Sequence, residues 1–127
     1  MSSLFKKSVD RVVPEGKSTR YYSSLQEKAV AKATKGKTVV NSGATAFVKG
    51  DVLSGDDWLI ECKTKVKDSE SITVKKEWFT KNQQEMAFMD KDYSAVVISF
   101  GPNQPNYYII DELTFQELLE YQKEKGN

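Results

Sequence analysis

The sequence predicts one α/β domain whose elements follow the order αβββαββα. Apolar residues recur at helical spacing in segments near the start, the middle and the end of the chain. Short β-branched and aromatic runs lie between these segments, bounded by glycine, proline and asparagine. At 127 residues, the chain is long enough for one core and too short for two ordinary domains.

The first part of the chain is predicted to hold an arm, a helix and a three-stranded meander. Residues 1–17 are polar and contain Pro14-Glu15-Gly16, which predicts a flexible or extended arm. A helix is expected over 18–35, ended by Gly36. Strands are expected at 39–40, at 46–48 with 52–53, and at 58–66, with Ser54-Gly55 turning the last pair.

The remainder is predicted to follow the order helix, strand, strand, helix. Apolar spacing predicts a helix from Lys75 to about Asp90. The apolar run at 95–100 predicts a buried strand, and 107–110 predicts another after a loop with two prolines. The last helix is expected to begin near Thr114, because Thr114-x-x-Glu117 has the form of a capping box. Residues 18–127 would therefore form a single domain.

Composition excludes several kinds of site. The chain has no histidine, which excludes histidine-based nuclease, protease and triad mechanisms. Cys62 is the only cysteine, so an intramolecular disulfide and a cysteine-cluster zinc site are excluded. No apolar run approaches the roughly 20 residues that span a bilayer, and the first residues lack the apolar stretch of a signal peptide. We expect no membrane partner and a cytoplasmic location.

Charge is distributed unevenly along the chain although the net charge is only +1. Residues 1–50 hold ten Lys and Arg against three Asp and Glu, whereas residues 82–127 hold three against eight. A basic amino-terminal part would meet a phosphate backbone while the acidic carboxy-terminal part faces solvent. The alternative is that the charges simply solvate both ends. The pattern is compatible with DNA binding.

The strongest chemical signal is Asp51 followed by the run Ile60-Glu61-Cys62-Lys63. Glu61 and Lys63 are two apart in a β-prone run, so both side chains leave the same face of a strand. The turn-rich stretch Ser54-Gly55-Asp56-Asp57 would fold Asp51 back beside Glu61. Two carboxylates and a lysine are therefore expected at one point.

These residue types suit a hard divalent cation that acts on a phosphodiester. Mg²⁺, or Mn²⁺ in its place, takes oxygen ligands and keeps several waters, so Asp51, Glu61 and a substrate phosphate form a sufficient site. Lys63 would orient the attacking water or offset charge that develops on the phosphorus. The residues predict metal-dependent phosphodiester hydrolysis.

The pattern resembles the PD-(D/E)xK nuclease superfamily, in which an acidic residue near a hairpin precedes a Glu/Asp-x-Lys strand. Gly50 stands where the signature has proline. The stretches Asn41-Ser42-Gly43-Ala44, Lys49-Gly50-Asp51 and Leu59-Ile60-Glu61-Cys62-Lys63-Thr64 look like the small Holliday-junction resolvases of archaea and their phage relatives. The resemblance runs from about Leu25 to about Phe100.

The resemblance implies a restriction-endonuclease-like fold with a mixed central β-sheet flanked by helices. It implies an endonuclease that resolves four-way DNA junctions, and a homodimer, because such a junction needs paired symmetric cuts. For a phage-encoded protein it implies the host cytoplasm. The alternatives are a restriction- or repair-type nuclease for other branched or duplex DNA, and a non-cleaving DNA-binding module; the intact Asp51, Glu61 and Lys63 favour an enzyme.

The resemblance also implies further metal ligands. Glu27 would join the catalytic cluster and reach the metal directly or through water. However, Ser24-x-x-Glu27 is also a capping box, a role that fails if the helix begins as early as Thr19. The backbone carbonyl of Cys62 would be another ligand, whereas its side chain alternates with Glu61 and Lys63 and is expected in the core.

Several candidate DNA contacts surround this cluster. Ser42 lies in a loop that contacts DNA or the active site in the resemblance, with an ordinary Asn-Ser-Gly turn as the alternative. Lys65 and Lys67 continue the face of Lys63 towards phosphates beyond the scissile bond. The remaining candidates are basic residues of the amino-terminal part: Lys6, Lys7, Arg11, Arg20 and Lys49.

Two other features carry weaker functional readings. In the resemblance, the helix after the Glu-x-Lys strand supplies an extra Gln or Lys to the site; the candidates here are Lys76, Lys81, Gln83 and Gln84, with a solvated helix face as the alternative. Residues 31–38 match a relaxed phosphate loop, AKATKGKT, but a true phosphate loop follows a strand and opens a helix. Here helical sequence comes first, so no nucleotide cofactor is expected.

Overall fold

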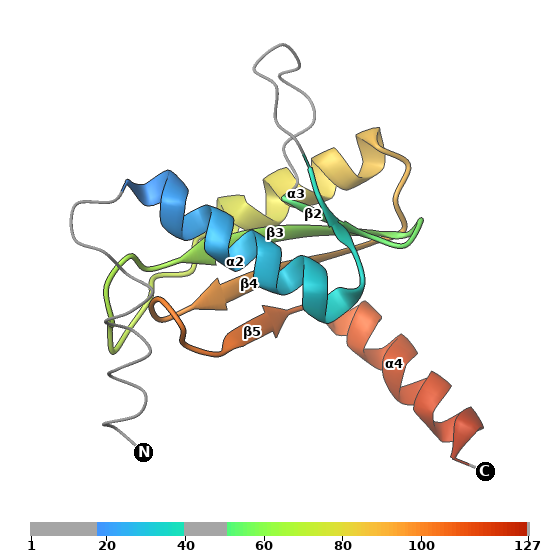
Figure 1. Ribbon diagram of the computed structural model, residues 1–127. Helices are drawn as coiled ribbons and strands as arrows, with labels where there is room; N and C mark the ends of the chain where they lie inside the picture. The colour runs from blue at the N-terminus through green and yellow to red at the C-terminus, as the bar shows by residue number, and fades with distance from the viewer. Residues whose placement is uncertain (1–17, 40–50, 127) are drawn as a thin grey trace.

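One five-stranded sheet organises the part of the chain that the computed structural model describes, residues 18–39 and 51–126 (Figure 1). The strands lie side by side in chain order, β1 to β5. Only the β3–β4 pair is parallel, so the sheet is mixed and open. The strand bounds are Lys37–Thr38 for β1, Val52–Ser54 for β2, Trp58–Thr64 for β3, Tyr93–Ser99 for β4 and Asn106–Ile109 for β5.

The helices of the described residues are α2 (Thr19–Thr34), α3 (Lys76–Phe88) and α4 (Glu112–Lys125). Parallel strands need a long crossover, and α3 provides it between β3 and β4. Helices α2 and α3 cover opposite faces of the sheet, whereas α4 projects away from it (Figure 1). The predicted single α/β domain and its order αβββαββα are confirmed for these residues.

The core between α2 and the sheet follows from strand alternation. Ile60 and Cys62 leave β3 on the side of α2 and pack against Val30 and against Val97 of β4. Val30 and Val97 are fully buried, and each such side chain contributes about 1.5–3 kcal/mol relative to an exposed one. The expected core position of the Cys62 side chain is confirmed, and burial raises the pKa of its thiol.

Helix α2 begins and ends differently from the prediction in detail. Ser18 is its N-cap and accepts a hydrogen bond from the Tyr21 N–H at 3.4 Å. At the other end Lys35, not glycine, adopts the left-handed conformation (φ 55°). Gly36 is needed for another reason, because a Cβ there would overlap the carbonyl of Leu53 in β2. The glycine therefore allows the helix end to touch the sheet.

Three predicted strand positions change or lie outside the described residues. The first strand is at 37–38 rather than 39–40, because Lys37 pairs with Leu53 and Thr38 with Val52. The segment predicted at 46–48 lies outside the described residues, as does the arm at 1–17. Strand β3 ends at Thr64 rather than Val66. The turn at Ser54-Gly55 is confirmed, with Gly55 at φ 60°.

The predicted start of the last helix at Thr114 was wrong. The N-cap is Asp111, whose Oδ1 accepts a hydrogen bond from the Thr114 N–H at 2.8 Å. Thr114 is instead buried in the first turn, and Glu117 accepts a hydrogen bond from the Tyr93 hydroxyl. No helix within residues 18–39 and 51–126 is long and apolar enough to cross a membrane.

Candidate functional site

Asp51 directly precedes β2 and lies at the end of the sheet where the pairing of β2 with β3 begins. Its N–H donates to the Ile60 carbonyl at 3.1 Å, and its Oδ2 accepts from the Cys62 N–H at 2.7 Å. The Asp51 carboxylate thus accepts the hydrogen bond of the Cys62 N–H, a bond that a backbone carbonyl would accept if β2 were longer. Because the N–H and C=O of a strand residue point the same way, the Cys62 carbonyl lies on this side of β3 too.

Glu61 and Lys63 leave the same face of β3, as the sequence predicts. Lys63 Nζ lies 3.4 Å from Glu61 Oε2, and the ammonium also sits 5.1 Å from the centre of the Trp78 ring of α3. Both side chains line a surface pocket between β3 and α3. The Glu61 carboxylate and the Lys63 ammonium therefore lie side by side at an accessible surface.

Glu27 approaches Asp51 from the opposite face of the sheet. Helix α2 begins at Thr19, so Glu27 lies two turns inside it and the capping-box reading is wrong. Its side chain is buried, its carboxyl group feels the charge of Asp51, and Arg20 Nη1 lies 3.5 Å from its Oε2. Asp51 thus lies between two glutamates, and its charge acts on Glu27 and on Glu61.

The surroundings of Glu27, Asp51 and Glu61 make it unfavourable for all three carboxyl groups to be ionised at once. Burial, then the negative charge of Asp51, raises the pKa of Glu27. Burial also raises the pKa of Asp51, against the lowering effect of the Cys62 N–H and of Lys63. For Glu61, burial and the charge of Asp51 raise the pKa to about 7. Arg20 and Lys63 offset two of three negative charges, so the cluster favours an added proton or cation.

The donor set fits a divalent cation of the Mg²⁺ type. Within the described ranges, no three or more Asp, Glu, Cys or His side chains form a ready-made cage for a metal ion. Mg²⁺ does not need one, since it is commonly bound by one or two carboxylates, waters and substrate phosphates. The unbalanced negative charge around Asp51 is the observation that fits such an ion.

Of the four residues expected from helix α3, only Lys81 lines the pocket that contains Glu61 and Lys63. None of Lys76, Gln83 and Gln84 lines the pocket that contains Glu61 and Lys63, and Gln83 lines a separate one. The residues that α3 and its N-cap bring to the Glu61 pocket are Lys75, Glu77, Trp78, Lys81 and Glu85. Apolar spacing predicted this helix but not the role of Trp78, because the sequence does not show which apolar residue of the helix faces a lysine.

Gln26 is a positioning residue that sequence reasoning missed. It is buried in α2, and its Nε2 donates to the Lys63 carbonyl at 2.9 Å and to Asn106 Oδ1 at 3.2 Å. These bonds tie the helix that carries Glu27 to the strand that carries Lys63. No sequence signal marks this role, because a glutamine in a helix is ordinarily a surface residue.

The candidate DNA contacts are only partly described. Arg20 is largely exposed beyond its pairing with Glu27. Lys65 and Lys67 are exposed and follow the carboxyl end of β3. The other candidates, Ser42, Lys49, Lys6, Lys7 and Arg11, lie outside the described residues. Comparison with protein-family models, curated proteins and solved structures finds no match for this chain.

Proposed function

We propose that this protein is a Mg²⁺-dependent endonuclease of the PD-(D/E)xK type with a restriction-endonuclease-like fold. The observation that carries the proposal is the place of Asp51 at the end of β2, where its charge acts on both Glu27 and Glu61, with Lys63 beside Glu61. The arrangement of a helix, an antiparallel β1–β2–β3 unit, a crossover helix and parallel β4 also supports it.

Each residue has a separate role in the proposal. Asp51 and Glu61 would hold the metal, together with the Cys62 carbonyl on the Asp51 side of β3. Glu27 supports the cluster directly or through water, and Arg20 holds its carboxylate in place. Bound Mg²⁺ would polarise the phosphodiester and lower the pKa of the attacking water.

Lys63 acts on the charge that develops during hydrolysis. Its ammonium is held between the Glu61 carboxylate and the Trp78 ring, so it is oriented before substrate arrives. A preoriented cation stabilises negative charge more strongly than mobile solvent does. Lys63 therefore lowers the barrier by stabilising the pentavalent phosphorus or by orienting the water.

The proposed substrate is DNA, preferably a four-way junction. The metal chemistry suits any phosphodiester, whereas the preference for a junction comes from the likeness of Asn41-Ser42-Gly43-Ala44 and Leu59-Ile60-Glu61-Cys62-Lys63-Thr64 to resolvases. Exposed Lys65 and Lys67 beyond β3 provide phosphate contacts next to the site. Lys49 and the basic residues of the amino-terminal arm are proposed to extend them.

Cleavage by matched variants tests the chemistry. Asp51→Asn and Glu61→Gln should abolish cutting of end-labelled DNA while retaining the far-UV circular dichroism of the unchanged protein, because each removes a ligand charge without changing volume. Lys63→Ala should slow single-turnover cleavage yet keep Mg²⁺ binding in calorimetry. Asp56→Asn, an exposed change in the adjacent β2–β3 turn, is the control and should cut normally.

Two results would reject the nuclease. One is undiminished cleavage in EDTA, and the other is Asp51→Asn cutting at the rate of Asp56→Asn. Substrate choice is tested separately by comparing a four-way junction, a linear duplex and single strands of the same sequence. Equal cleavage of duplex and junction would be consistent with a nuclease but would reject the proposal that it is a junction resolvase.

A further inference from the structure

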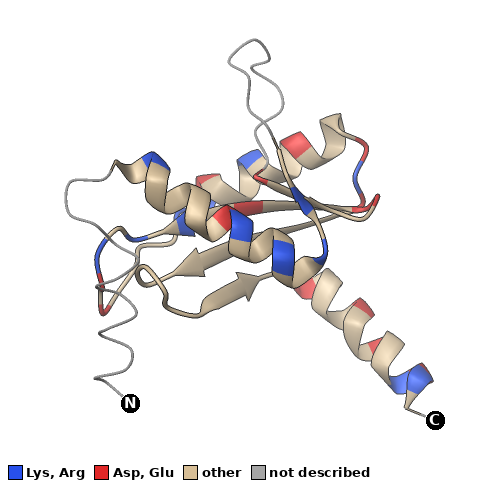
Figure 2. Ribbon diagram, in the orientation of Figure 1, with Lys and Arg blue, Asp and Glu red and all other residues tan. Residues whose placement is uncertain are grey.

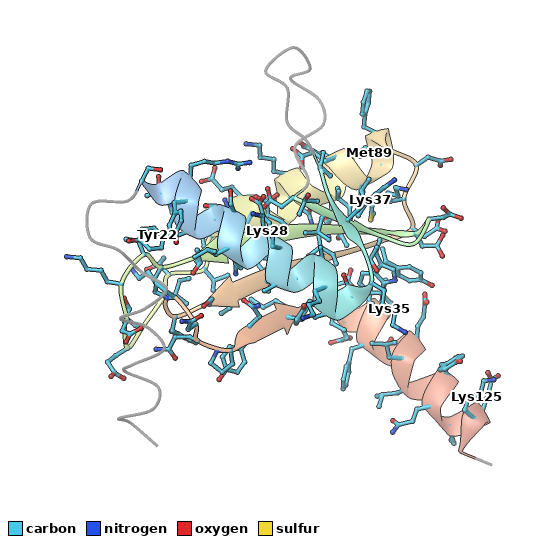
Figure 3. All side chains as sticks on the ribbon, in the orientation of Figure 1. Tyr22, Lys28, Lys35, Lys37, Met89 and Lys125 are labelled. Atoms are coloured by element: carbon cyan, nitrogen blue, oxygen red, sulfur yellow. The ribbon has the colours of Figure 1, made fainter. Side chains whose placement is uncertain are left out.

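A pocket lies at the carboxyl ends of the two parallel strands, on the sheet face that α2 covers. Thr64, the last residue of β3, and Ser99, the last residue of β4, both line it. Helix α2 contributes Tyr22, which Figure 3 labels near the start of that helix, and the loop between β4 and β5 contributes Pro102. None of the side chains of the candidate metal site lines it, so the two sites are separate. Ligands of open α/β sheets commonly bind at this end of the strands.

Gln26 lines the pocket and carries a buried acceptor without a partner. Its Nε2 lies among oxygen atoms: the Lys63 carbonyl at 2.9 Å, Asn106 Oδ1 at 3.2 Å and the Val97 carbonyl at 3.5 Å. These acceptors fix which end of the amide is the NH₂ group, so the other end is the acceptor Oε1. Oε1 is buried and accepts no hydrogen bond from any residue that the structure describes. A buried acceptor without a donor is unfavourable, so a ligand that brings an N–H to Oε1 gains affinity.

The size and the lining of the pocket fit one small uncharged ring. Its volume is about 160 Å³, close to the roughly 150 Å³ of a protein cavity that holds one benzene molecule. Among the described residues that line it, none is Lys, Arg, Asp or Glu. Tyr22 and Pro102, both buried residues, give it apolar surface. A phosphate or a carboxylate would lose its hydration here without gaining a counter-charge, so the lining excludes a charged group.

Basic residues lie beside the pocket rather than inside it. Lys65 directly follows Thr64, and its N–H donates to the Ser99 carbonyl at 3.1 Å, so the sheet fixes its backbone next to the pocket. Lys65 and Lys67 are both exposed. Figure 2 shows this separation, with basic positions on the segment after β3 and only uncharged residues along β4 and β5. An uncharged pocket with cations at its edge is complementary to a nucleotide, whose base is neutral and whose phosphate is anionic.

We propose that this pocket binds one unpaired pyrimidine base of the DNA strand, with Gln26 Oε1 accepting a hydrogen bond from the base and Lys65 contacting the phosphate. The single-ring volume favours a pyrimidine over a purine. Cytosine fits best because its exocyclic amine is a donor, whereas thymine has a carbonyl at that position. The inference rests on the proposed function in that DNA is the source of the base. It adds a preference for an unpaired cytosine to the metal chemistry.

Binding of bulged duplexes in EDTA tests the pocket without cleavage. By fluorescence anisotropy, a labelled duplex with one unpaired cytosine should bind about five- to tenfold more tightly than the same duplex with an abasic site in its place. A duplex with an unpaired pyrimidin-2-one, which is cytosine without the amine, should bind about threefold or more weakly than the cytosine bulge, because it offers Gln26 no N–H. Equal affinity for the three duplexes would overturn the proposal.

Matched substitutions in α2 test whether the base occupies this pocket. Ala29 lines the pocket and is exposed, so Ala29→Leu should fill part of the space and remove the preference for the cytosine bulge. Ala33→Leu is the control: it makes the same change one turn later, at an exposed position that does not line the pocket, and should keep the preference. Leucine is a good helix former, and circular dichroism checks that both variants fold. An intact preference in Ala29→Leu, or an equal loss in both variants, would reject the pocket as the binding site.

Free 2′-deoxycytidine separates the base from its strand and the pocket from the nuclease. In EDTA, titration into the ¹⁵N-labelled full chain should shift the amide signals of Thr64, Ser99 and Gly101, which line the pocket. Such shifts without any preference for the bulged cytosine would mean that the ligand is a free nucleoside and would reject the strand-bound base. A protein that prefers the cytosine bulge but never cuts DNA with Mg²⁺ would reject the nuclease and support the pocket.

Discussion

Helices α2 and α4 are similar in length but are used differently. Helix α2 has 16 residues and buries Tyr22, Gln26, Glu27, Val30 and Ala31, whereas α4 has 14 residues and buries only Thr114. One helix crosses the sheet and delivers a carboxylate to the candidate site. The other begins beside the sheet, and its large apolar side chains remain exposed.

The number and size of apolar residues in a helix do not determine how much of that helix is buried in this protein. Helix α2 packs through Val30 and Ala31, yet it also buries polar Gln26 and Glu27, which bond to β3 and to Asp51. Helix α4 has larger apolar residues and leaves them exposed. Buried polar groups need partners, and those of α2 lie against β3 and Asp51, whereas the large apolar groups of α4 remain exposed.

The largest expected difference between the two helices is in catalysis. Glu27→Gln should slow DNA cleavage by about 10²–10³-fold, the scale seen when one preorganised charge-stabilising group is removed. Glu117→Gln in α4 should leave the single-turnover rate unchanged, because Glu117 pairs with Tyr93, away from the candidate site. Single-turnover cleavage with excess enzyme measures both.

A purely structural role for Glu27 would give another pattern. Because burial and the charge of Asp51 raise the pKa of Glu27, Glu27→Gln removes an unfavourable charge and should not lower thermal stability. Lost activity with unchanged or higher melting temperature supports the site. Full activity together with lost stability would show that Glu27 serves packing alone.

A second difference is expected in stability. Val30→Ala should lower the free energy of unfolding by about 1.5–3 kcal/mol, because Val30 is fully buried and its loss leaves a cavity. Leu119→Ala should change it by less than about 0.5 kcal/mol, because Leu119 is 48% exposed. Urea unfolding measures both, and a larger effect at Leu119 would mean that α4 packs in the monomer after all.

A third expectation concerns pH. The folded pKa of Glu61 is about 7, above its ordinary value of 4.5, so the folded state holds this proton more tightly than the unfolded state. The resulting stability is present below about pH 4.5 and is lost as pH rises through 7. In EDTA, stability should therefore fall between pH 5 and 8, by on the order of 1–3 kcal/mol.

Urea unfolding at several pH values in EDTA measures this loss. Glu61→Gln should reduce the loss, because its amide does not titrate, whereas Glu120→Gln on exposed α4 should reproduce the unchanged curve. Glu27 and Asp51 have raised pKa values as well, so part of the slope should persist in Glu61→Gln. A flat curve for the unchanged protein would mean that Glu61 titrates normally.

Much of the fold was predictable because its signals are local. Alternating apolar residues and turn residues located β3, the Ser54-Gly55 turn and α3 to within about two residues. The same alternation placed Glu61 and Lys63 on one face and Cys62 in the core. These features depend on the chain within one strand or turn, where periodicity determines orientation.

The remaining features depend on contacts between distant segments. The capping box at Thr114 was predicted from local sequence alone, whereas in the structure Thr114 is buried and Asp111 is the N-cap. The bonds of Gln26 reach residues 37 or more positions away, to Lys63 and beyond, so no local pattern reports them. The same holds for the choice of Trp78 as the contact of Lys63.

The smallest expected effect is a difference in the stability that the N-cap residues of α2 and α4 contribute. Asp111 accepts from the Thr114 N–H at 2.8 Å, a stronger bond than the one of 3.4 Å at Ser18. Asp111→Ala should cost about 1 kcal/mol, and Ser18→Ala less. Because α4 is barely packed, the cost at Asp111 should appear as faster amide hydrogen exchange within α4, with the exchange of β3 and β4 unchanged.

The charge of Asp111 gives this cap its own dependence on pH. Its hydrogen bonds with Thr114 lower the pKa of the Asp111 carboxyl, so this stabilisation is present above the ordinary value of 3.8 and is lost as pH falls through the lower folded value. Asp111→Asn should keep the cap but remove that dependence, because the amide oxygen still accepts a hydrogen bond. Exchange in α4 that is equally fast in Asp111→Ala and in the unchanged protein would show that this helix is held by Thr114 and Glu117 rather than by its cap.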